Sequence, residues 1–157
     1  MAAPSLTVVD TNDRPVTSWD NGVVQANNEG PVLTIIIWNN RGGEVSVADL
    51  KDANITTLDI DGRAISEVVQ GKWTRVNVPS TDEDDTVWTP IGGTTAKMLR
   101  ADGLEEIDGF TIKGVANDGN IHNATENYCT IHLKTRVPAG VSAGIRDWKL
   151  RISGYFV

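Results

Sequence analysis

Short runs of alternating hydrophobic and polar residues recur along the chain, and this period of two predicts β-strands. Three runs are clear, at residues 72–78, 128–137 and 148–156. In the second run, Cys129 and Ile131 share one face, which would be buried, while the residues between them face outward. Segment 95–100 fits either a short strand or a short helix. Further strands are expected at 6–9, 31–38, 55–60, 86–91 and 110–116.

The segment 31–38 differs from the other runs because apolar residues occupy both of its faces. A strand buried on both sides has this pattern, so we expect it in the centre of a sheet. Turn-forming residues separate the runs, and helical periodicity is nearly absent. The pattern predicts an all-β fold, an antiparallel immunoglobulin-like β-sandwich of seven to nine strands with little or no helix.

No linker or internal repeat divides the chain, so its 157 residues are expected to form one domain. Within it, residues 1–30 would form an N-terminal strand and a polar arm, and residues 31–157 the sandwich body. Residues 10–30 are polar and poor in core residues, which predicts an arm that is free to reach a neighbouring molecule.

Net charge and hydropathy exclude two classes of partner. The formal charge of −7 repels phosphate, so nucleic acid is not an expected partner. The longest apolar run, 32–38, is too short to cross a membrane, and no membrane partner is expected. The first residues lack the pattern of a signal peptide, and the single cysteine, Cys129, cannot form an internal disulfide. Synthesis in a cytoplasm is therefore expected.

No set of residues with recognisable catalytic or metal-binding spacing is found. Residues 140–144 match the G-x-S-x-G pattern of serine hydrolases, but Ser142 lies between two expected strands and no histidine follows it. His132 faces away from Cys129 on its strand, and His122 lies in an expected loop. We therefore expect no enzyme, no metal and no cofactor. A hydrolase that uses Ser142 as its nucleophile is kept as one functional alternative, beside the two binding functions described below.

Tryptophan provides the candidate binding residues. Of the five tryptophans, Trp38 and Trp148 lie in apolar runs and are expected in the core. Trp19 lies in a polar loop, and Trp73 is expected to share a strand face with Arg75. Tryptophan and arginine are enriched at protein interfaces, so Trp19, Trp73 and Arg75 are the interface candidates. Exposed tryptophans also stack on sugar rings, which leaves a carbohydrate-binding module as the alternative.

Four segments carry a family resemblance: 38–43, 71–73, 137–145 and 148–155. They resemble segments of small immunoglobulin-like accessory proteins on tailed-phage virions, the last two resembling the closing hairpin. The resemblance implies a non-enzymatic virion structural protein, made in the host cytoplasm. It would be a capsid decoration or tail-accessory protein that binds a symmetric lattice of other virion proteins.

The same resemblance bears on assembly. Self-association usually produces closed symmetry, so a homo-oligomer is expected. Decoration proteins often occupy threefold positions of a lattice, which makes a trimer the expected form. Trp19 in the polar arm would be the anchor on the neighbouring molecule.

Overall fold

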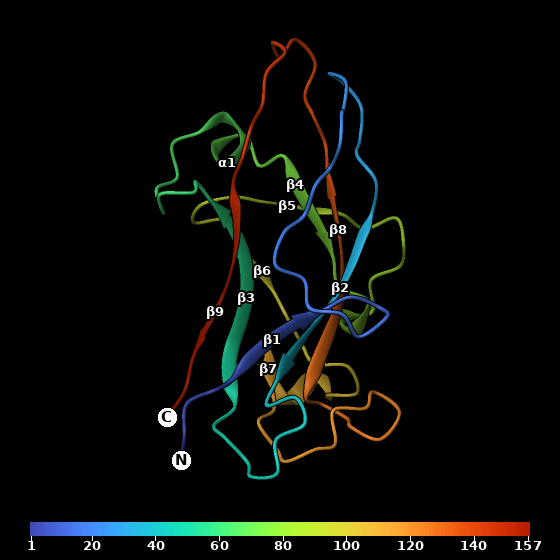
Figure 1. Ribbon diagram of the computed structural model, residues 1–157, viewed down its shortest axis with the longest axis vertical. Coiled ribbons are helices and arrows are strands. Elements are labelled where there is room, and N and C mark those ends of the chain that lie inside the picture. The colour runs from blue at the N-terminus through green and yellow to red at the C-terminus, as the bar shows by residue number, and fades with distance from the viewer.

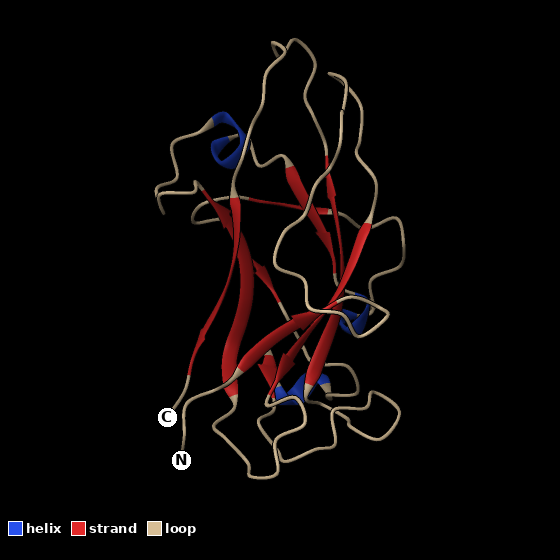
Figure 2. Ribbon diagram, viewed as in Figure 1, coloured by secondary structure: helices blue, strands red, loops and turns tan.

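The computed structural model describes all 157 residues and is nearly all β, with antiparallel strand pairing (Figures 1 and 2). The strands are β1 (Leu6–Val9), β2 (Leu33–Asn39), β3 (Leu50–Leu58), β4 (Thr74–Asn77), β5 (Thr89–Ile91), β6 (Lys97–Met98), β7 (Thr111–Ile112), β8 (Tyr128–Thr135) and β9 (Lys149–Tyr155). The helical turns are α1 (Glu67–Gln70), η1 (Pro79–Thr81) and η2 (Glu106–Asp108). The predicted all-β antiparallel fold is confirmed, while an immunoglobulin-like strand order stays a prediction.

The strands form two sheets that face each other (Figure 1). The first has five strands in the order β1-β2-β8-β4-β5. The second is built on β3, which pairs with β9 along one edge. The shorter strands β6 and β7 pair along the other edge of β3. Strands β1 and β9 therefore lie at the edges of their sheets, with no further strand beyond them.

The main core lies between the sheets and follows the alternation of the sequence. The inward residues of β8, Cys129, Ile131 and Leu133, are wholly buried, as predicted. Strand β2 is buried on both faces, as its apolar pattern predicts. Its Ile35 faces the main core, and its outer face holds Trp38, which packs with Val9, Ile36 and Ala124.

Asn39, at the end of β2, ties three segments together. Its side chain is fully buried and its amide donates to the carbonyls of Ala48, at 3.0 Å, and Ile112, at 3.1 Å. Its Oδ1 accepts a hydrogen bond of 2.9 Å from the backbone N–H of Ser5. A residue that the sequence places in a turn therefore links both sheets to the N-terminal strand.

Some strand boundaries and facings differ from the prediction. The strand expected at 55–60 begins at Leu50 and ends at Leu58, and only two residues of 95–100 form strand. The alternation of segment 148–156 predicts that Phe156 faces the core, but its side chain is half-exposed. Strand β9 and its pairing with β3 end at Tyr155, one residue before it.

The prediction of a free N-terminal arm over residues 10–30 is wrong. Val16 and Trp19 pack against the main core. Thr135 donates a 2.9 Å hydrogen bond to Asn21, and its carbonyl accepts one of 2.8 Å from Gly30. These contacts tie the segment to its own domain at Val16, Trp19, Asn21 and Gly30.

Two long loops extend beyond the sheets at one end of the sandwich. They join β1 to β2 and β8 to β9, and they rise side by side at the top of Figure 1. The backbone N–H of Val137 donates to Asn28 at 2.9 Å, and that of Asn27 donates to Pro138 at 3.3 Å. These bonds prolong the pairing of β2 with β8 and hold the two loops together.

Candidate functional site: a cavity at the open edge of the sandwich

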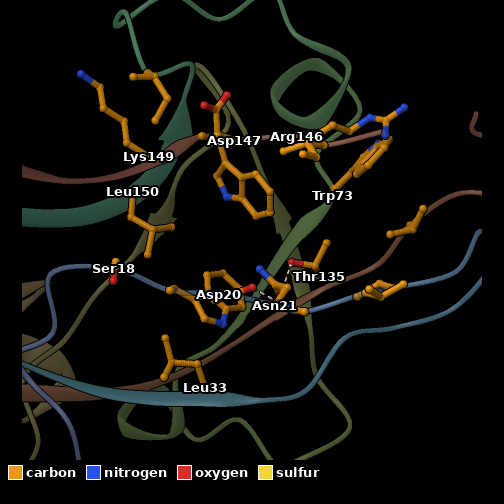
Figure 3. A pocket seen from close by; sticks show the side chains of 18 of the residues that line it. Ser18, Asp20, Asn21, Leu33, Trp73, Thr135, Arg146, Asp147, Lys149 and Leu150 are labelled. Atoms are coloured by element: carbon orange, nitrogen blue, oxygen red, sulfur yellow. Dashed lines mark hydrogen bonds between the residues drawn. The ribbon is translucent and has the colours of Figure 1, made fainter. Parts of the chain in front are cut away.

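A cavity of about 1120 Å³ lies between the two sheets, at the side where β1 and β9 form their edges. The five-stranded sheet contributes Val8, Leu33 and Ile35 to its wall. Leu150, labelled in Figure 3, and Ile152 of β9 form the facing wall. Both side chains are only half-buried. A concave, mostly apolar space of this size is the candidate binding site of the chain.

Three tryptophans line the part of the cavity beneath the long loops. The rings of Trp19 and Trp148 meet edge to face, with centroids 6.2 Å apart. Trp73 is buried against Val68, and the guanidinium of Arg146 lies 5.4 Å from its ring centroid. These contacts fix the indole rings, so the wall is formed before any partner binds.

Three of the polar side chains around the cavity, Arg146, Thr135 and Asn21, are hydrogen-bonded within the chain. Arg146 donates to the carboxylate of Glu67 and to the carbonyls of Ser142 and Gly144. The hydrogen bond between Thr135 and Asn21, drawn dashed in Figure 3, closes another pair. Of the 29 lining residues, 17 are hydrophobic, so the surface offered to a partner is chiefly apolar.

Hydrophobic side chains are also exposed around this cavity. Val23, from the first long loop, is 98% exposed, and Ile145, from the second, is fully exposed. Ile60, in the segment after β3, is 56% exposed. Because these three side chains line the same cavity, they are candidate contact residues for a partner.

The structure brings together two of the three predicted interface residues. Trp19 and Trp73 both line the cavity, whereas Arg75 lies opposite Lys134 on the pair of β4 with β8 and does not. The predicted surface shared by Trp73 and Arg75 is wrong, because Trp73 is only 5% exposed. Trp73 does not follow the alternation of side chains along β4, because this strand begins at Thr74 and Lys72 has a left-handed φ of 52°.

Several lining residues were not identified from the sequence. Trp148, expected in the core, is half-buried and lines the cavity. Val24, which could have belonged to a short strand in the polar segment, and Val141 and Ile145, in a turn segment, also line the cavity. None of these three forms strand in the structure. The signal that could have identified them is the presence of branched apolar residues inside glycine-containing loops, where turn chemistry does not require them.

The other side chains that could take part in catalysis or metal binding lie apart from one another. Ser142 is in the exposed loop between β8 and β9. His132 pairs with Thr34, with 2.7 Å between Nδ1 and Oγ1. No three histidine, cysteine or acidic side chains lie together as a metal site would need, and no helix has the length and apolarity of a membrane span.

Cys129 should be unreactive in the folded chain. Burial, together with the nearby charge of Asp102, raises the pKa of its thiol to about 12. At pH 8 only about one thiol in ten thousand would then be ionised, and the thiolate is the nucleophile.

Native protein should therefore not react with a disulfide reagent such as dithionitrobenzoate over an hour, while urea-unfolded protein should release one equivalent of the coloured thiolate. A Ser142→Cys variant, whose new thiol is exposed, should react at once in the native state. Rapid reaction of the unsubstituted native chain would contradict the buried placement.

Comparison of the chain with protein-family models, curated proteins and solved structures finds no match. The function is therefore argued from the geometry of the cavity and the loops beside it.

Proposed function

We propose that this chain is a non-enzymatic structural protein of a tailed-phage virion, a capsid decoration or tail-accessory protein that binds a symmetric lattice of other virion proteins. The observation that supports it best is the apolar cavity with the exposed side chains of Val23 and Ile145 beside it. The resemblance of segments 137–145 and 148–155 to phage accessory proteins supplies the kind of partner. These segments form part of the second long loop and the whole of β9.

The form of the cavity favours a protein partner over a sugar. Sugar binding needs an open indole face and free polar groups beside it. Here Trp73 is buried, Trp19 meets Trp148 edge to face, and Arg146 is already hydrogen-bonded. Anchors of a protein interface, by contrast, are aromatic side chains in apolar pockets that exclude water. The carbohydrate-binding alternative has less support for this reason.

Attachment to a symmetric lattice would bring copies of the chain together, so a homo-oligomer, with a trimer as the preferred form, belongs to the same proposal. Localisation to the virion after synthesis in the host cytoplasm also belongs to it. The preformed walls of the cavity suit repeated docking, because a rigid surface loses less entropy when it binds.

A particle-binding assay tests the proposal. Purified chain is mixed with particles of the encoding phage that lack it, and bound protein is measured after sedimentation. Val23→Asp combined with Ile145→Asp should weaken binding at least tenfold, because two carboxylates would enter an apolar contact. Both side chains are exposed, so the fold should not change.

The matched control is Ile107→Asp, a residue 88% exposed in η2 and absent from the lining of the cavity. It should bind as the unsubstituted chain does. Equal binding by the double variant, or no binding by the unsubstituted chain, would contradict the proposal. Glycan binding that Trp19→Ala abolishes, without effect on particles, would support the carbohydrate alternative instead.

A further inference from the structure

We propose that the cavity is the site of strand addition: an extended segment of the partner protein pairs with the open edge of β9 and places apolar side chains between the sheets. This inference rests on the proposed function for the identity of the partner, a neighbouring virion protein. The segment itself is defined by its chemistry, with apolar residues at every second position and acidic residues between them.

The backbone of β9 has an open edge along the cavity. Hydrogen bonds run from Gly93 to the carbonyl of Thr57 and from Leu99 to that of Ala53, so the odd-numbered residues of β3 turn their backbone groups toward β6. Successive residues of a strand alternate in this direction. In the register of β3 with β9, Leu150 lies opposite Thr57 and Ile152 lies opposite Ile55. Because Thr57 and Ile55 are odd-numbered residues of β3, they exchange no backbone hydrogen bonds with their partners on β9.

Leu150 and Ile152 therefore direct their backbone N–H and C=O groups away from β3, toward the open edge. No hydrogen bond to these groups is found from that side. Unpaired groups on an edge strand are a ready template for another extended chain.

The side chains of the same two residues point into the cavity. Leu150 and Ile152 both line it and pack against the main core. Figure 3 shows Leu150 in this position. Residues directly opposite each other on paired strands have their side chains on the same face. A segment paired with β9 would therefore place alternate side chains beside Leu150 and Ile152, against Val8, Val16 and Trp19 on the other wall.

The open backbone edge of β9, rather than the volume of the cavity, favours a polypeptide segment over a small molecule. The cavity has about 1120 Å³, and 17 of its 29 lining residues are hydrophobic, which suits apolar side chains of an added strand. Among its polar side chains, Arg146, Asn21 and Thr135 are hydrogen-bonded to other parts of the chain. A strand brings its own backbone donors and acceptors and needs only those of β9.

The positive charges on β9 indicate which polar residues the partner segment would carry. Lys149 and Arg151, whose side chains alternate with Leu150 and Ile152, are exposed, and neither has a carboxylate partner. The outward side of β9 therefore carries two cations whose charge is not balanced by a carboxylate of the same chain. Opposite charges facing each other across paired strands are favourable, so glutamate or aspartate is expected opposite these two residues.

A model peptide tests the site on the isolated chain. The probe is an eight-residue peptide of alternating valine and glutamate with blocked ends. Its binding is followed by amide hydrogen exchange in NMR spectra. The amides of Leu150 and Ile152 should become protected at least tenfold, because they acquire a hydrogen-bond partner. Those of Arg151 and Ser153, which already face β3, should not change.

Two matched comparisons make the result specific. Lys149→Glu combined with Arg151→Glu should weaken peptide binding about tenfold. Lys72→Glu, which reverses an exposed cation that has no ion-pair partner and does not line the cavity, should leave binding unchanged. A peptide methylated on the backbone nitrogens that would face β9 should not bind, because it has lost the donors of the added strand.

Three results would overturn the inference: no protection of Leu150 and Ile152, equal binding of the methylated peptide, or no effect of charge reversal on β9. The first would mean that Lys149 and Arg151 only protect an edge strand from aggregation. The peptide assay is independent of the particle assay. Peptide binding without particle binding would remove the virion role and leave the strand site, and the reverse would place the lattice contact elsewhere.

Discussion

Replacing Trp38 by alanine should lower the free energy of unfolding by about 3–5 kcal/mol. Trp38 is fully buried on the outer face of β2 and packs against Tyr128, with ring centroids 4.8 Å apart. Val9 of β1 and Ala124, in the loop between β7 and β8, also pack against it. Alanine would leave a cavity among three separate segments that cannot close without moving one of them. Urea unfolding followed by circular dichroism measures the change.

Trp38→Phe is the matched control. The indole Nε1 of Trp38 is buried and has no hydrogen-bond partner, so phenylalanine removes an unsatisfied donor as well as part of the ring. These two effects oppose each other, and the expected loss is below about 1.5 kcal/mol. If Trp38→Ala also lowered the free energy of unfolding by less than about 1 kcal/mol, the residues around Trp38 on the outer face of β2 would not form a well-packed cluster.

Asn39→Ala should lower the free energy of unfolding by about 2–4 kcal/mol. The substitution removes both donors to the carbonyls of Ala48 and Ile112 and the acceptor for the N–H of Ser5. Water cannot easily replace them, because the side chain of Asn39 is fully buried. Each group left without a partner would carry the cost of its desolvation. The same urea titration measures this effect.

Asn39→Asp separates hydrogen bonding from size. The aspartate side chain keeps an acceptor for Ser5 but can donate to neither carbonyl while it is ionised, so it should destabilise at least as much as alanine at pH 7. Asn28→Ala, which removes one exposed bond of 3.4 Å, should stay within about 0.5 kcal/mol of the unsubstituted chain. Near-equal stability of the Asn39 and Asn28 variants would contradict the linking role of Asn39.

The all-β class could be read from the sequence because half-buried strands leave a visible period of two. Residues 128–137 show it clearly, and their inward side chains are buried as expected. The role of Asn39 could not be read in the same way. Asparagine followed by glycine-rich sequence favours a turn, and only the arrival of Ala48 and Ile112 in space makes the same side chain a buried connector.

The site was only partly predictable. Trp19 was identified because a large aromatic residue is unusual in a polar segment, and it does line the cavity. The cavity itself depends on how far β9 stands from β1 and on how two loops fold over that gap, and neither is encoded locally. Val23, beside Val24 in a polar segment, and Ile145, in a turn segment, are far apart in sequence. They lie beside one cavity only in the folded protein.

Imaging of the intact particle by electron cryo-microscopy tests the central claim most directly. The account predicts density for one sandwich at each equivalent position of the capsid or tail lattice, with the two long loops and the edge of β9 turned toward a neighbouring protein. The end of the sandwich that carries η2 would then point away from the lattice (Figure 2). Particles with no such density, or a sandwich attached through the η2 end with the cavity open to solvent, would contradict it.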